Sequence, residues 1–153
     1  MVQNRQNQDS LHFLTDKISF NNIDVSFLVR KKEDIRVLIT SLVEKEKKAF
    51  GFFSFNFCSD KYLLKINKKY LNHKDLTDII TFDLSENDII SGDIYISTER
   101  VKDNAHLYKK KCSEEIIRVM IHGVLHLCGY SDKTPADISL MRRKENHYLS
   151  LWA

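Results

Sequence analysis

The chain has 153 residues, a length that fits one domain. Hydrophobic residues make up 42% and aromatic residues 10%, which supports a folded core and excludes a wholly disordered chain. Basic residues number 24 and acidic residues 21, so the net charge of +3 neither requires nor excludes a nucleic-acid partner. The 4 glycines and 1 proline exclude collagen-like and proline-rich classes.

The cysteines and the N-terminus indicate a cellular compartment. Cys58, Cys112 and Cys128 are odd in number and widely spaced, which is typical of a protein in a reducing environment rather than of a disulfide framework. Residues 1–10 are polar, lack the apolar core of a signal peptide and are expected to fray. No apolar run is long enough to cross a bilayer, so we expect a cytoplasmic protein without a membrane partner.

The first half of the chain predicts strands and one helix. Two apolar pieces, residues 11–14 and 25–29, are expected to form strands. Apolar residues then recur at helical spacing over 35–43, in a helix that ends near Gly51. Residues 52–58 alternate phenylalanine with polar side chains, which predicts a half-buried strand.

Helices alternate with strands in the following segment. Ser59 is a suitable N-cap for a short helix that ends at about residue 70. Strands are predicted over 78–84 and 93–97, with a turn-rich segment between them. Thr98 is expected to cap a helix that ends at about residue 108.

The C-terminal part predicts two further helices. The more apolar one spans 113–128 and ends at Gly129, and Thr134 caps another that continues towards Trp152. Strands interleaved with helices predict one α/β (α+β) domain over residues 1–153. We expect a small, mixed, mostly parallel sheet with helices packed on it.

The chemistry is concentrated where the apolar helix ends. His122 and His126 are four residues apart, so both imidazoles project from one helix face, a common arrangement for binding a transition metal. Gly129 lets the chain fold back, so that Asp132 can bring a carboxylate to the same point. We predict a metal site formed by His122, His126 and Asp132, with a coordination position left open for catalysis.

Neighbouring residues and the charge of Asp132 restrict the chemistry that this site can perform. Cys128 is a possible soft ligand, but its position two residues past His126 favours a core role. Gly123 follows the first histidine where HExxH proteases carry their glutamate base, which disfavours that route of peptide hydrolysis. The anionic Asp132 also makes the ion a weaker Lewis acid than three neutral histidines would. Two imidazoles and a carboxylate accept zinc, nickel, manganese or iron.

The motif around the two histidines resembles the signature of the YbeY family of bacterial metal-dependent endoribonucleases, with Asp132 where the family has a third histidine. The resemblance covers about residues 67–132. Leu71 stands where the family has an arginine and Leu76 where it has a proline. The upstream matches are Asn67, Tyr70, Lys74-Asp75, Thr77-Asp78, Phe82 and Gly92-Asp93-Ile94.

The resemblance implies an α/β fold with one zinc ion per chain. It also implies single-strand-specific cleavage of RNA, in 3′-end maturation of small-subunit ribosomal RNA and in ribosome quality control. A strip of lysines interleaved with aromatic residues is compatible with RNA contact, and we name Lys68, Lys69, His73 and Lys74 as candidate RNA-binding residues. A second basic run, Lys109-Lys110-Lys111, precedes the histidine helix.

The leading hypothesis is an endoribonuclease that uses either water or the neighbouring 2′-hydroxyl as nucleophile. Its general base is unassigned, with Asp78 and Asp93 as candidates because of their places at strand ends. The alternatives are a non-enzymatic, metal-stabilised ribosome-assembly factor that binds RNA or the small subunit, and a hydrolase of another small substrate.

Overall fold

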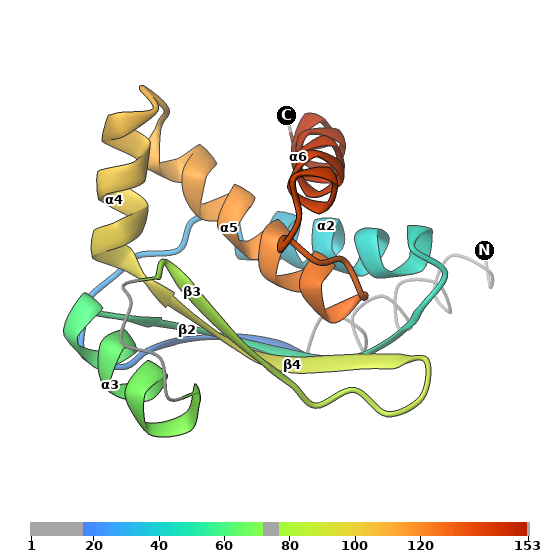
Figure 1. Cartoon of the computed structure of the whole chain (residues 1–153), viewed down its shortest axis with the longest axis horizontal. Helices are drawn as coiled ribbons and strands as arrows, with labels where there is room; N and C mark the ends of the chain where they lie inside the picture. The colour runs from blue at the N-terminus through green and yellow to red at the C-terminus, as the bar shows by residue number, and fades with distance from the viewer. Residues whose placement is uncertain (1–16, 72–76, 153) are drawn as a thin grey trace, which may run out of the picture.

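The structure, a computed structural model, describes residues 17–71 and 77–152. Within these ranges the chain forms one four-stranded sheet and five helices (Figure 1). The strands are β1 (Ile18–Asn22), β2 (Ala49–Cys58), β3 (Ile79–Asp83) and β4 (Ile89–Ser97). The helices are α2 (Lys32–Lys45), α3 (Asp60–Leu71), α4 (Thr98–Leu107), α5 (Cys112–Leu127) and α6 (Pro135–Ser150).

The sheet is mixed and mostly parallel, as predicted. Its strand order is β1-β2-β4-β3; β1, β2 and β4 run parallel to one another, and β3 pairs antiparallel with β4. β3 is therefore an edge strand, and several of its residues line a cleft at the end of α5.

Alternation along the strands divides the core between the two faces of the sheet. Phe53, Phe55 and Phe57 of β2 belong to the larger core, which also contains buried residues of α2 and α5. The opposite face of β3 and β4 packs against α3 through a smaller cluster that includes Ile80 and, half-buried, Tyr95. Figure 1 shows α3 on the other side of the sheet from α5 and α6.

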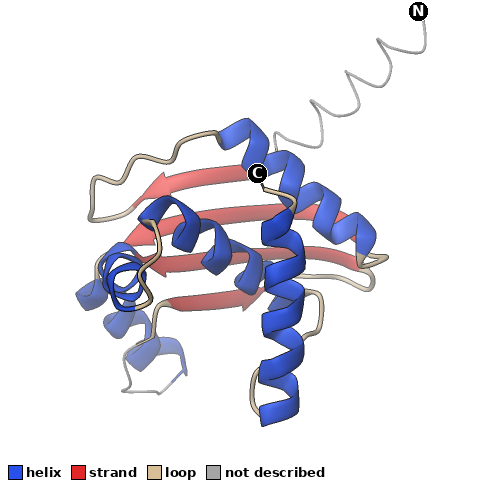
Figure 2. Cartoon of the chain, turned by 90° about the horizontal axis from the view of Figure 1, so that it is seen from above, coloured by secondary structure: helices blue, strands red, loops and turns tan. Residues whose placement is uncertain are grey.

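Helix α5 is the central helix of the larger layer. Most of its residues are buried, and it contacts α2, α4, α6, β3 and β4. Gly123 permits close packing on the sheet: a Cβ at this position would lie 2.8 Å from Ile79 and 3.3 Å from Ile94. Figure 2 shows the helices of this layer crossing over the strands.

One predicted strand is wrong, and a real strand was missed. Residues 25–29 form no ladder, although Val25, Phe27 and Val29 pack against the larger core and Phe27 lies 5.1 Å from Phe57 between ring centroids. Apolar side chains alternate in this segment because one of its faces packs on the core, but no neighbouring strand among the described residues is available to form backbone hydrogen bonds with it. The strand beside β2 at the other edge of the sheet is β1 instead, and the polar asparagines at its end hide it from an argument based on strand propensity. The strand predicted at 11–14 lies outside the described residues.

Helix ends agree with the sequence-based prediction more closely than strand ends do. Gly129 has a φ of 108°, and Thr134, the predicted cap of the last helix, forms a capping box with Asp137. Ser97, rather than Thr98, caps α4 by accepting the backbone N–H of Arg100. β4 begins at Ile89, earlier than the predicted residue 93.

Within the described ranges, every helix is too short or too polar to serve as a membrane span.

Candidate metal centre

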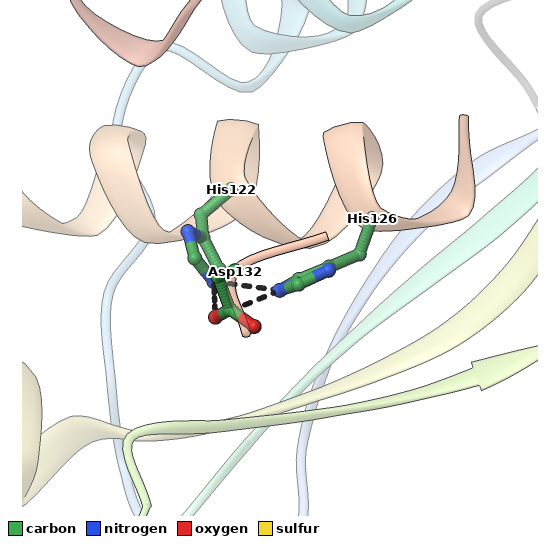
Figure 3. Close-up of side chains that lie close together, drawn as sticks. All are labelled: His122, His126 and Asp132. Atoms are coloured by element: carbon green, nitrogen blue, oxygen red, sulfur yellow. Dashed lines mark hydrogen bonds and ion pairs between the residues drawn. The ribbon is translucent and has the colours of Figure 1, made fainter. Parts of the chain in front are cut away.

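Two imidazoles from α5 and one carboxylate converge at the end of that helix (Figure 3). The Nε2 atoms of His122 and His126 lie 2.9 Å apart. An Oδ2 atom of Asp132 lies 3.5 Å from the first of these nitrogens and 3.3 Å from the second. The structure thus brings together all three predicted ligands.

The three ligand atoms fit a tetrahedral ion. Metal–ligand bonds of about 2.0–2.1 Å place neighbouring tetrahedral ligand atoms roughly 3.3 Å apart, and the observed separations are 2.9, 3.3 and 3.5 Å. All three side chains are at least partly accessible, with Asp132 the most exposed. The donor set therefore suits a transition metal such as zinc and leaves one side open.

Glu145 of α6 orients His122. Its Oε2 atom accepts a hydrogen bond from His122 Nδ1 at 2.8 Å, although the glutamate is only 5% exposed. Burial opposes charge on His122, but the hydrogen bond and negative charge of Glu145 outweigh it and raise the pKa of this histidine. Glu145 is itself held by Arg118, whose Nη1 atom lies 3.1 Å from its Oε1.

The turn after α5 orients His126. Gly129 adopts a positive φ of 108°, and the chain then brings the backbone carbonyl of Tyr130 within 2.9 Å of His126 Nδ1. The hydroxyl of Tyr130 donates to Glu46 at 2.6 Å. Glu46, which follows α2, also accepts hydrogen bonds from Tyr148 at 2.5 Å and Lys144 at 3.1 Å.

These partners determine which nitrogen of each ring is free. A carboxylate and a backbone carbonyl only accept hydrogen bonds, so His122 and His126 each donate through Nδ1. In the neutral form of each ring, which is the form that binds a metal, Nε2 then carries a lone pair, and the two lone pairs meet near the Asp132 carboxylate. Such a concentration of electron density is stabilised by a cation, and the outer hydrogen bonds are those typical of metal-binding histidines.

A cleft of about 480 Å³ opens from the three ligands towards β3 and the end of α3, and Asn67, Leu71 and Thr81 are among its lining residues. Asp78 lines it beside His122 and His126. Burial raises the pKa of Asp78, with partial opposition from His122. Asp93 instead accepts a hydrogen bond from Ser54 at 2.7 Å, on the sheet face turned away from α5. Of the two candidate bases, only Asp78 belongs to the site.

The other residues that the sequence predicts for the site do not line the cleft or lie outside the described residues. Lys68 and Lys69 are exposed in the last turn of α3, between cleft residues Asn67 and Leu71, but do not line the cleft themselves. His73 and Lys74 lie outside the described residues. Cys128 packs against the larger core, and burial raises the pKa of its thiol to about 12, which disfavours the thiolate needed for metal binding.

Sequence reasoning missed Glu145 and the pairing of Glu46 with Tyr130. The signal for Glu145 was available, because it stands between Met141 and Tyr148 on the buried side of α6. A carboxylate at an inward position of an amphipathic helix needs a polar partner. Glu46 gave no such signal, since its partners come from distant parts of the chain.

Comparison with known proteins identifies the family. The model of the family described as Endoribonuclease YbeY matches residues 17–153. A relative named Endoribonuclease YbeY from Flavobacterium psychrophilum is 50% identical over 135 residues, covering 88% of this chain and 96% of the relative. One of the same name from Cytophaga hutchinsonii is 44% identical over 137 residues, covering 89% and 96%.

A solved structure agrees with the architecture. The solution structure of TM1509 from Thermotoga maritima superposes with a TM-score of 0.63 at 24% identity, covering 88% of each chain. This likeness supports the fold alone, whereas the two sequence relatives match a similar share of the chain at 50% and 44% identity. The resemblance drawn from the histidine motif is thereby confirmed: the chain belongs to the YbeY family.

Proposed function

We propose that this protein is a metal-dependent endoribonuclease whose active site is the cluster of His122, His126 and Asp132. The observation that carries the proposal is the convergence of two imidazole Nε2 atoms and a carboxylate at the mouth of a cleft that also contains Asp78. The names of the sequence relatives give the reaction class, cleavage within an RNA chain.

Zinc is the proposed ion, held by His122, His126 and Asp132 with one side facing the cleft. Bound there, it would supply positive charge to the scissile phosphate and make a nearby nucleophile easier to deprotonate. Glu145 and the carbonyl of Tyr130 keep the two rings in the orientation that presents Nε2.

Asp78 is the proposed proton acceptor. It lines the cleft beside His122, and burial raises its pKa, which makes the carboxylate a stronger base than an exposed aspartate. In hydrolysis, water forms a new bond to phosphorus, a bond from phosphorus to a ribose oxygen breaks, and Asp78 takes a proton from the attacking water. The leaving oxygen is protonated by solvent.

The proposed biological substrate is small-subunit ribosomal RNA, cleaved in single-stranded regions during 3′-end maturation and ribosome quality control in the cytoplasm. The family resemblance supports this substrate. Lys68 and Lys69, with His73 and Lys74, are proposed to contact RNA. Their lysine and imidazole groups suit phosphate contacts, and the last residue of α3, Leu71, lines the cleft.

The test compares two histidine variants after loading with zinc. His126→Ala should abolish cleavage of a single-stranded RNA containing the small-subunit 3′ end, because it removes one ligand. His106→Ala, on α4 and outside the cluster, should cleave at the wild-type rate. Circular dichroism checks that both variants are folded, and elemental analysis gives their metal content.

Two results would reject the proposal. Undiminished cleavage by metal-free His126→Ala protein would show that the cluster is not the active site. Tight RNA binding without cleavage by the zinc-loaded wild type, in preparations free of contaminating nuclease, would favour an assembly factor instead.

A further inference from the structure

A second cleft also borders the metal centre. It has a volume of about 630 Å³ and shares His122, Asp132 and Asp78 with the first cleft, but its other lining residues come from α4, α5 and α6 and from the turn after α4. We propose that single-stranded RNA occupies this second cleft next to the scissile phosphate, held by Lys110, Arg142 and Tyr108. This inference rests on the proposed function and names a surface that the RNA crosses.

In the second cleft, buried acidic side chains lie in the inner part and exposed basic side chains lie in the outer part. The acidic members of the cleft include Glu115 and Glu145, both almost fully buried. Arg118 is already engaged, because it donates to Glu145 at 3.1 Å and to Asn146 at 2.9 Å. The inner part of the cleft therefore has little positive charge to offer a phosphate.

The outer part carries two available cations. Among the described residues, Lys110 is exposed and forms no ion pair. The side chain of Arg142 is 60% exposed, and the one ion pair that it forms within the described part of the chain, with Glu145, spans 3.9 Å. Two accessible cations beside a centre that acts on phosphodiesters are suited to neighbouring phosphates of the same strand.

The turn between α4 and α5 fixes the position of Lys110. Lys109 adopts a left-handed conformation with a φ of 55°, and the backbone N–H of Lys110 donates to the carbonyl of Ala105 at 2.8 Å. This closure of a helix C-terminus holds the turn rigidly. In this turn the three lysines of the basic run lie in different places: Lys110 lines the cleft, whereas Lys109 and Lys111 do not.

Tyr108 gives the surface a preference for unpaired bases. It ends α4, is 60% exposed and lines the second cleft, and it makes no ring contact with other described residues. An exposed aromatic ring beside cations can stack on a base only when that base is not enclosed in a duplex. The combination therefore fits a single strand.

The decisive experiment compares two double variants with equal loss of charge. K110Q/R142Q removes the two cations of the second cleft, and K109Q/R143Q removes their sequence neighbours, which do not line it. Affinity is measured by fluorescence anisotropy with a labelled single-stranded RNA and metal-free protein at several salt concentrations. Cleavage by the zinc-loaded proteins is measured in parallel.

We expect K110Q/R142Q to bind about tenfold more weakly, and the slope of log affinity against log salt to fall by about 1.4, or roughly 0.7 for each lost phosphate contact on a single strand. K109Q/R143Q should retain the wild-type slope and affinity within about twofold. Tyr108→Ala should weaken binding at least about fivefold without changing the slope, and Tyr108→Phe should preserve it.

Equal losses in the two double variants, or no loss in either, would overturn the proposed surface. That result would leave the endoribonuclease assignment intact if wild-type protein cleaves RNA and His126→Ala does not. Conversely, a selective loss of binding in K110Q/R142Q with no cleavage by the wild type would retain the RNA surface and reject the enzymatic function. Equal zinc content in all variants excludes damage to the metal centre.

Discussion

At the scale of single residues, the site depends on hydrogen bonds that lie outside the three ligands. Glu145 and the carbonyl of Tyr130 each accept from an Nδ1 atom, which leaves both Nε2 atoms free to bind an ion. The neutral tautomer is thus selected by acceptors that are built into the fold. Replacing such an acceptor should affect metal affinity even though the replaced residue touches no metal.

Glu145→Gln should lower zinc affinity by about 10–100-fold, the range typical of lost outer hydrogen-bond partners of metal ligands. The amide keeps the size of the side chain but loses the negative charge that balances His122 and Arg118. Competition with a chromophoric chelator measures the affinity. Asn146→Ala is the matched control, because it removes the other partner of Arg118 but no contact to a histidine. Equal affinities for Glu145→Gln and wild type would contradict the role of this charge.

Glu46 should make the protein sensitive to acid. Burial alone would raise its pKa, but hydrogen bonds from Tyr130, Tyr148 and Lys144 outweigh burial and lower it below the ordinary 4.5. A lowered pKa in the folded state stabilises the fold above pH 4.5, and this stabilisation is lost as the pH falls through the folded-state value.

Denaturant unfolding of the metal-free protein at a series of pH values tests this expectation. Below about pH 4.5, the free energy of unfolding should fall less steeply for Glu46→Gln than for the wild type. Glu44→Gln, on the exposed side of α2, should follow the wild-type curve. Superimposable curves for all three proteins would show that the carboxylate of Glu46 contributes no acid-sensitive stability.

At the scale of elements, the metal centre is a junction between α5, the turn that follows it, α6 and the end of α2. The turn supplies Asp132 and the carbonyl of Tyr130, α6 supplies Glu145, and Glu46 fastens the turn to α2. Tyr130 and Tyr148 donate to the same carboxylate, but only Tyr130 belongs to the turn that holds His126. This difference separates a general packing role from a role in positioning the ligand.

Tyr130→Phe should therefore weaken zinc binding several-fold, because the turn that carries the carbonyl acceptor of His126 loses its anchor. Tyr148→Phe removes a hydrogen bond from the same Glu46 and should leave zinc affinity within about twofold, while each variant loses about 1 kcal/mol of stability. Chelator competition and denaturant unfolding provide the two measurements. If zinc affinity follows stability equally in both variants, Tyr130 has no positioning role.

At the scale of the whole molecule, sequence reasoning succeeded where the signal is local. Periodicity located most helices, the capping chemistry of Thr134 and Gly129 set their ends, and the spacing of His122 and His126 placed both rings on one face. It failed where the outcome depends on distant partners. Residues 25–29 have the alternation of a strand but no neighbour to pair with, and β1 becomes a strand because β2 is available beside it.

The residues that form and support the site come from α2, α5, α6 and the turn after α5, so zinc binding should stabilise the whole fold against heat. Zinc bound to the folded state alone stabilises it by about 4 kcal/mol at a free concentration 1,000 times Kd, and each kcal/mol corresponds to roughly 2–4 °C for a domain of this size. Differential scanning calorimetry should therefore show a rise of about 8–16 °C on zinc addition. His126→Ala should abolish the rise, and magnesium should not reproduce it, because nitrogen ligands disfavour that ion. A similar rise in the melting temperature of the His126→Ala variant would show that zinc binds elsewhere. The junction of α2, α5 and α6 would then have no role in metal binding.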